Sequence, residues 1–312
     1  MHAECPALSR EAADIDANAT ATGLKPVLSL TALVLFGLAF IGPTAPYTFF
    51  GIGAAQSRGH FATVYLVALV AVSFTAASYA RMAAAFPHAG STYTYTAKAI
   101  HPLAGYIAGW AMILDYLLLP MVCVIIAATT SHELWPAVPY GAWVVIAASG
   151  VTAVNLRGIE VTSRATLLFS AVLAVSILWF LGAAFRALTR GAGSGTLLSL
   201  QPFYSPPDFS WSLIMAATPI AVLSFLGFDG ISTLAEDARE PQKNIGRATL
   251  LACVIVGALF ILQTYAGQLL WPDYTSFVSQ ATAFSEIGRK VGGPALGQVI
   301  VLLVVAQAWM SG

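Results

Sequence analysis

Long uninterrupted runs of apolar residues limit what this chain can fold into. Residues 28–55 and 248–270 contain no charged side chain, and residues 103–129 contain only Asp115. A helix crosses the roughly 30 Å hydrocarbon core of a bilayer with about 20 apolar residues. Only 9% of the 312 residues are charged and 58% are hydrophobic, whereas soluble domains carry about 25% charged residues. We therefore expect a multi-pass membrane protein and exclude an ordinary soluble enzyme or a disordered chain.

Eight apolar runs are long enough to be predicted as membrane spans. They are continuous rather than alternating, which favours helices over the strands of a membrane barrel. The sequence therefore predicts an all-α membrane protein with about eight helices. The predicted spans are residues 28–55, 62–84, 103–129, 138–156, 165–188, 211–235, 248–270 and 295–312.

Several functional classes find no support in the composition. Fourteen Lys and Arg residues balance fourteen Asp and Glu residues, so there is no excess of positive charge to attract nucleic acid. The three cysteines and the scattered histidines do not have the spacing of a metal site. We find no nucleophile paired with a base, so we expect no enzyme, cofactor or metal. The oligomeric state is not readable.

The distribution of basic residues predicts the orientation in the membrane, because cytoplasmic loops are enriched in Lys and Arg. An N-terminus in the cytoplasm places more of them inside than the opposite orientation does. We therefore expect residues 1–26 to be a disordered cytoplasmic tail. The residues then inside are Arg10, Lys25, Arg81, Lys98, Arg157, Arg164, Arg239, Lys243 and Arg247, and those outside are Arg58, Arg186, Arg190, Arg289 and Lys290.

Two of the predicted spans contain helix breakers near their middle. In the first, Pro43 and Pro46 have no N–H to donate to the carbonyls of Ala39 and Gly42. In the sixth, Gly227 and Gly230 flank Phe228 and Asp229, and Pro219 precedes them. A single break of this kind is better read as a proline kink, which transmembrane helices tolerate. Two breaks at matching positions of inverted repeats instead indicate the binding site of a transporter.

The five-span separation between the two breaks implies repeats of opposite orientation, since an odd number of spans inverts the chain. We accordingly expect a first five-helix repeat at residues 27–188, an extracytoplasmic loop at 189–210, and an incomplete second repeat at 211–312 that holds helices six to eight. The last run ends at Gly312 with no polar flank, and we expect the chain to be truncated at its C-terminus.

Two longer motifs resemble those of a known family. Residues 86–110, FPHAGSTYTYTAKAIHPLAGYIAGW, and residues 224–248, SFLGFDGISTLAEDAREPQKNIGRA, are similar to signatures of the amino acid–polyamine–organocation permeases. The LDYLLLP run around Asp115 looks most like the putrescine-importer and related bacterial branches. The resemblance implies a core of five plus five inverted helices, with substrate between the unwound parts of the first and sixth. It also implies coupling to protons or to solute exchange.

The chain departs from the family pattern at two further places. Residues 42–46, GPTAP, stand where many members have a break of the Gly-Ser-Gly type, which puts binding of a substrate carboxylate by backbone amides in doubt. Some proton-coupled members carry a lysine in the fifth span, but Leu173 stands at the matching position. A coupling mechanism based on that lysine is therefore in doubt.

The candidate binding residues follow from the two breaks and from the carboxylates inside spans. An ionisable group within a span is costly and indicates a functional site. Asp229 could receive an amine or a proton, or could instead cap the second half of its span or make a structural hydrogen bond. For the phenylalanines, plain helix packing is an equal alternative. The candidates are Ile41, Gly42, Pro43, Thr44, Ala45, Asp115, Tyr116, Ser224, Phe225, Gly227, Phe228 and Asp229.

We therefore expect a secondary active transporter of the cytoplasmic (inner) membrane that moves an amino acid or small organic amine by alternating access. The alternative is a non-transporting, truncated fragment of such a permease. A channel and an intramembrane enzyme are weaker alternatives, because no continuous polar pore face and no paired catalytic groups are present. The sequence does not distinguish a zwitterion from a diamine.

Overall fold

The computed structural model describes residues 28–86, 91–156 and 159–311, and this part of the chain is built from helices. The predicted tail at residues 1–26 lies outside the described residues. The only strand-like contact in the described part is an isolated bridge between Leu28 and Ala238. Here Leu28 N donates to Asp237 O at 3.0 Å and Arg239 N donates to Leu28 O at 2.9 Å. The bridge fastens the start of the first span to the segment after the sixth.

Every predicted span coincides with a helix or a pair of helices. The helices are α2 (Leu30–Ile41), α3 (Ala45–Gln56), α4 (Phe61–Ala85), α5 (Ser91–Ala99), α6 (Pro102–Leu134), α7 (Tyr140–Asn155), α8 (Ile159–Thr189), α9 (Trp211–Leu223), α10 (Gly230–Thr233), α11 (Pro241–Leu270) and α12 (Ala283–Ser311). Five of the described helices, in α4, α6, α8, α11 and α12, are each long and apolar enough to cross a membrane, and the bent pair α2–α3 makes a sixth span. The helices α7 and α9 are apolar but shorter. The chain is a multi-pass, all-α membrane protein.

Both predicted breaks interrupt their spans. The helices α2 and α3 meet at an angle of 50° across residues 42–44. The sixth span stops being helical at Ser224 and resumes only at Gly230, as the short helix α10. Pro219 does not start this break, because α9 continues through it to Leu223. The interruption begins instead where residues 224–229 form tight turns around Gly227, whose φ is +98°.

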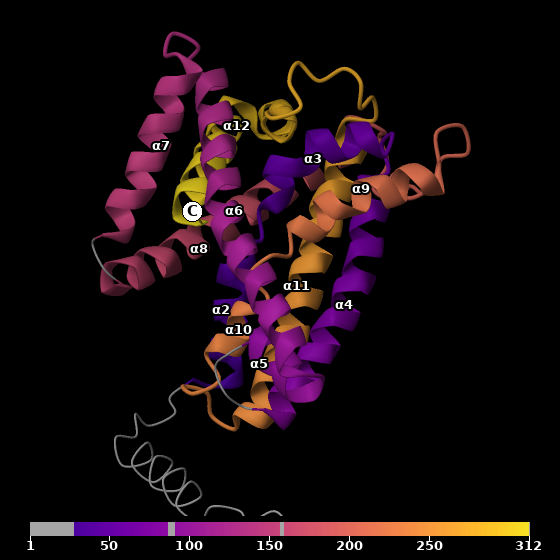
Figure 1. The fold of residues 1–312 in the computed structure, drawn as a ribbon. Coiled ribbons are helices and arrows are strands. Elements are labelled where there is room, and N and C mark those ends of the chain that lie inside the picture. The colour runs from indigo at the N-terminus through magenta and orange to yellow at the C-terminus, as the bar shows by residue number, and fades with distance from the viewer. Residues whose placement is uncertain (1–27, 87–90, 157–158, 312) are drawn as a thin grey trace, which may run out of the picture.

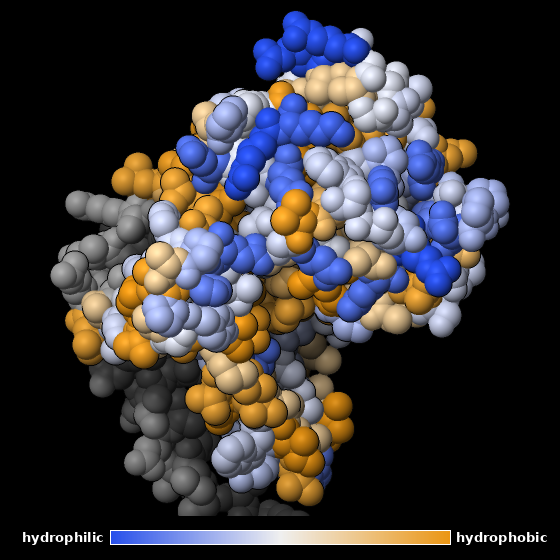
Figure 2. Space-filling view, turned by 90° about the horizontal axis from the view of Figure 1, so that it is seen from above, coloured by the Kyte–Doolittle hydropathy of each residue, from blue (hydrophilic) through white to orange (hydrophobic). Residues whose placement is uncertain are grey.

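The helices separate the molecule into two ends (Figure 1). The helices α5 and α10 and the starts of α2 and α11 lie at the end drawn at the bottom, and α3, α7 and the loop from α11 to α12 lie at the top. We call these the α5 end and the α3 end. Figure 2 views the α3 end and shows polar residues gathered on it, with apolar residues more frequent toward its rim. Such a polar end is expected where helices leave a bilayer.

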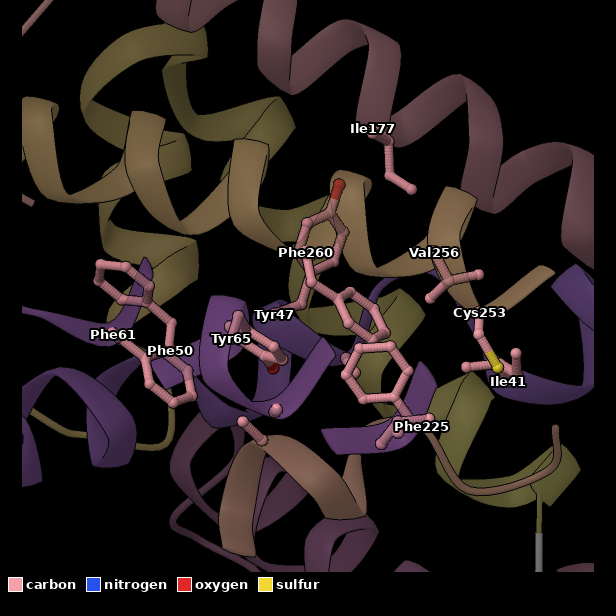
Figure 3. Packing of buried hydrophobic residues seen from close by; sticks show 14 of the residues in the cluster. Ile41, Tyr47, Phe50, Phe61, Tyr65, Ile177, Phe225, Cys253, Val256 and Phe260 are labelled. Atoms are coloured by element: carbon pink, nitrogen blue, oxygen red, sulfur yellow. The ribbon is translucent and has the colours of Figure 1, made fainter. Parts of the chain in front are cut away.

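Aromatic side chains fill the core between the helices. Phe225, in the break after α9, packs edge-on against Phe260 of α11 with ring centroids 5.2 Å apart. Tyr65 of α4 lies 5.1 Å from Phe260 and is hydrogen-bonded to the Ser224 hydroxyl at 2.9 Å. Figure 3 shows these rings together with Ile41 at the end of α2. The core therefore holds the two broken segments in place through α4 and α11.

The packing partners repeat between the two halves of the chain. The helix α4 packs against α9, and in the same way α11 packs against α2. In addition α4 packs along α11, and α6 packs along α12. Numbered as spans, these pairs are two with six, seven with one, two with seven, and three with eight, and an exchange of the two halves in an inverted five-helix repeat maps this set onto itself. The exact division at residues 27–188, 189–210 and 211–312 remains a prediction.

The two breaks touch each other through their backbones. A Cβ atom at Gly227 would lie 2.7 Å from the carbonyl oxygen of Phe40 and 3.0 Å from its carbonyl carbon. The positive φ of Gly227 also belongs to a region that other residues enter only at a cost of about 1–3 kcal/mol. Glycine therefore allows the sixth span to lie directly against the end of α2.

We expect Gly227→Ala to destabilise the protein by at least the strain cost of about 1–3 kcal/mol, because both the clash and the positive φ act against alanine. Thermal unfolding of the purified protein in detergent measures this as a lower Tm. The matched control is Gly182→Ala in α8, where an added Cβ meets nothing within 4 Å. Its Tm should stay the same or rise slightly, since alanine favours the helix. Equal Tm values for both variants would contradict the close contact.

Candidate functional site

A central cavity of about 420 Å³ lies where the two breaks face α6, α8 and α12. Five spans line it: the two broken ones, α6, α8 and α12. Its volume is in the range of small-ligand pockets. The lining residues are Ala39, Phe40, Gly42, Asp115, Tyr116, Leu119, Phe169, Ser170, Leu173, Leu226, Gly227, Asp229, Gly230, Thr233 and Gln307.

Two carboxylates face this cavity. Asp115 comes from α6 and Asp229 from the break before α10. The Tyr116 hydroxyl donates to Asp229 Oδ2 at 3.3 Å, whereas Asp115 has no hydrogen bond or ion pair with any described residue. None of the described lining residues is Lys, Arg or His. The cavity therefore carries negative charge without a described cation to balance it.

Asp229 does not cap the second half of its span. It stands at the N-cap position of α10, but its side chain accepts no hydrogen bond from that helix. The contacts to α10 come from its backbone carbonyl, which accepts from Ser232 N at 2.9 Å and Ser232 Oγ at 2.6 Å. The side chain therefore makes no cap here; its described hydrogen bond is the structural one with Tyr116, and the carboxylate also lines the cavity.

The end of α2 adds further negative potential. Gly42 N donates to Leu38 O at 3.2 Å, but the next three carbonyls, those of Ala39, Phe40 and Ile41, receive no backbone donor from a described residue. Proline at position 43 removes the first of these donors, as the sequence predicts. Unsatisfied carbonyls at a helix C-terminus carry the negative end of its dipole. This end of α2 therefore favours a cation.

The start of α3 offers little to an anion in return. Pro46 has no N–H, and Tyr47 N already donates to Thr44 O at 2.8 Å. Ala45 N donates to Gly42 O at 3.3 Å. Most of the amides that would bind an anion at a helix N-terminus are thus missing or occupied. This agrees with the doubt that the GPTAP sequence raised about carboxylate binding.

Two glutamines from distant helices support the first break. Gln263 Nε2 of α11 donates to Pro43 O at 2.9 Å and to Leu259 O at 3.0 Å. Gln307 of α12 accepts a hydrogen bond from the Thr44 hydroxyl, and its amide lies where a Cβ of Gly42 would be. Neither glutamine was among the predicted residues. The sequence feature that could have identified them is an uncharged polar side chain within an apolar run, at residues 248–270 for Gln263 and 295–312 for Gln307.

Two further cavities continue the central one along α6. On the α3 side, a cavity of about 120 Å³ shares Phe40, Leu119, Leu226 and Gln307 with it. On the α5 side, a cavity of about 370 Å³ shares Asp115, Tyr116, Leu226 and Asp229 with it. One stripe of α6 from Ala108 to Ile126 lines all three in order. At 1.5 Å per residue this stripe covers about 27 Å, close to the thickness of the hydrocarbon core.

The structure brings most of the predicted residues to these cavities. Gly42, Asp115, Tyr116, Gly227 and Asp229 line the central cavity, Ile41, Ala45 and Ser224 line the α3-side cavity, and Phe228 lines the α5-side cavity. Pro43, Thr44 and Phe225 line none of the three. Pro43 and Thr44 take part through their bonds to Gln263 and Gln307. Phe225 is buried and points toward Phe260, which is the packing role that stood as the alternative (Figure 3).

Known proteins of similar sequence are membrane transporters. The family model described as amino acid permease matches residues 33–312. The low-affinity putrescine importer PlaP of Escherichia coli K12 is 36% identical over 282 residues, which cover 90% of this chain and 62% of that protein. The branched-chain amino acid permease BcaP of Bacillus subtilis is 25% identical, over 93% of this chain and 67% of that protein. The chain thus spans about three fifths of PlaP. It belongs to the amino acid permease family.

Proposed function

We propose that this chain forms the substrate-binding part of a secondary active permease that moves a small organic amine by alternating access. The observation that carries the proposal is the central cavity, where Asp115 and Asp229 meet the open carbonyl end of α2 and no described cation balances them. An ionised carboxylate within a membrane span is costly unless a partner compensates it. An ammonium group of the substrate is that partner.

A diamine fits this electrostatic pattern better than an amino acid does. Two carboxylates and the open carbonyls of Ala39 and Phe40 offer acceptors for two ammonium groups, whereas the start of α3 has few donors left for a carboxylate. The 36% identity to a putrescine importer supports the same substrate class. The amide of Gln307 is the group on which an amino acid's carboxylate would depend, since it lines the same cavity.

The proposal includes a cytoplasmic (inner) membrane location with the N-terminus inside, so that the α5 end faces the cytoplasm. Arg81, Lys98, Arg239 and Lys243 support this orientation, because they belong to the last turns of α4, to α5, to the residues just before α11 and to its start, which lie at the α5 end. Substrate would reach the central cavity from either side as one helix bundle rocks against the other. The energy would come from protons or from exchange with a second solute.

Leu173 bears on the coupling mechanism. It is buried and lines the central cavity from α8, so a lysine at this position would face Asp115 and Asp229. With leucine there, the ionisable groups that remain in the cavity lining are the two aspartates and Tyr116. If uptake is coupled to protons, these carboxylates are the groups that would carry them.

We expect Asp115→Asn to weaken binding of 1,4-diaminobutane by the value of a hydrogen bond to a charged group, about 1.5–3 kcal/mol, or on the order of tenfold to a hundredfold in Kd. Asp229→Asn should weaken it as well, and binding of a zwitterion such as leucine should change far less. Isothermal titration of the protein in nanodiscs measures each Kd. The matched control is Asp237→Asn, an exposed carboxylate outside the three cavities. Unchanged Kd values in both cavity variants would refute the amine site.

Uptake into proteoliposomes separates binding from transport. A chain that binds and accumulates the amine against a gradient is a permease on its own. Binding without uptake would support the alternative, a non-transporting part of such a permease, while leaving the binding site intact. If uptake is proton-coupled, its pH dependence should change in Asp115→Asn or Asp229→Asn. The same pH profile in both variants and the wild type would exclude coupling through these carboxylates.

Chemical labelling tests the proposed orientation. In a Cys5→Ser background, an impermeant maleimide should label Arg190→Cys from outside intact cells and should label Lys243→Cys only after permeabilisation. The remaining cysteines, Cys123 and Cys253, are buried and provide little background. The opposite labelling pattern would place the N-terminus outside.

A further inference from the structure

The α5-side cavity has a wall of its own that the central cavity lacks. Its volume is about 370 Å³, and Tyr79, Thr92, Ala108, Ala111, Met112 and Phe228 line it but not the central cavity. These residues come from α4, α5, α6 and the break before α10. The cavity therefore lies between the central cavity and the α5 end of the molecule.

Aromatic rings surround this second cavity. Tyr79 and Phe228 pack edge to face with centroids 5.4 Å apart, and Tyr116 lines the cavity as well. The Tyr79 hydroxyl is hydrogen-bonded to Thr92 of α5, and its ring also contacts Tyr95 at 5.9 Å. These contacts fix the Tyr79 ring at the cavity wall. Aromatic rings attract ammonium ions through their quadrupole, most strongly where water is excluded.

The two aspartates serve both cavities. Asp115 and Asp229 line the central and the α5-side cavity alike, and so does Tyr116, whose hydroxyl donates to Asp229. None of the described residues that line the α5-side cavity is Lys, Arg or His. The second cavity therefore combines uncompensated negative charge with aromatic walls, which is the chemistry of an organic-cation site.

We propose that the α5-side cavity is a second binding site for an organic ammonium ion, through which the substrate passes between the central cavity and the α5 end. The inference rests on the proposed function, because the same kind of ligand occupies both cavities. The aspartates keep the ammonium group neutralised along the way, and the aromatic rings replace the open carbonyls of α2 as its other contacts.

Binding stoichiometry tests the second site. The probe is n-butylammonium, whose single charge allows one molecule per site, and isothermal titration of the chain in nanodiscs counts the bound molecules. We expect two per chain for the wild type. Ala108→Phe fills only the α5-side cavity and Thr233→Phe only the central one, since each residue lines just one of them. Each variant should therefore bind one molecule.

The outcomes separate this inference from the proposed function. One bound molecule in the wild type, lost in Thr233→Phe and kept in Ala108→Phe, would overturn the second site and leave the central site standing. Two molecules in Ala108→Phe would also overturn it. No binding in the wild type or in any variant would refute both proposals.

A second pair of variants tests the aromatic wall without filling the cavity. Tyr79→Leu removes the ring and should weaken the second binding event by about tenfold, as expected for a desolvated cation–π contact. Tyr79→Phe keeps the ring and loses only the hydroxyl bonded to Thr92, so the second event should persist. Equal weakening in both variants would show that the hydroxyl and its packing matter rather than the ring, and would overturn the cation site.

Discussion

The structure depends on how backbone polar groups are satisfied where two membrane helices break. In a bilayer an unpaired carbonyl or amide is costly, so broken helices persist only where protein groups or a lined cavity receive them. Here the Gln263 amide donates a hydrogen bond to the carbonyl of Pro43, and tight turns pair most of the amides between Ser224 and Gly230. The carbonyls of Ala39 and Phe40, at the end of α2, have no backbone donor among the described residues, and both residues line the central cavity. The first break is therefore stabilised by the hydrogen bond from Gln263 of α11, and both breaks border the central cavity.

The direction of these breaks underlies the proposed preference of the cavity for a cation. The end of α2 presents carbonyls, whereas the start of α3 has lost one amide to Pro46 and uses others internally. Asp115 and Asp229 add negative charge from α6 and from the sixth span. Because these contributions have the same sign, the proposed site would prefer a cation whatever the particular substrate. The stripe on α6 extends this preference toward the α5 end.

Some site residues were predictable because a local rule identifies them. Proline and glycine mark the two breaks, and a carboxylate within an apolar span stands out against its neighbours, so Gly42, Gly227, Asp115 and Asp229 followed from the sequence. Other residues depend on contacts between distant parts of the chain. Thr44 meets Gln307, 263 positions away, and Phe225 turns toward Phe260 rather than toward a cavity. No local pattern specifies such partners, because each helix face could pack in several ways.

The sequence by itself determined that the chain is an all-α membrane protein with two broken spans, because apolar run length and missing N–H groups act within one segment. It also suggested the family, which the comparisons confirmed. Only the tertiary structure decided that both breaks touch at Gly227 and Phe40, that Asp229 bonds to Tyr116 instead of capping α10, and that three cavities follow α6. These features arise from the packing of helices against one another, and packing depends on side chains that are remote in sequence.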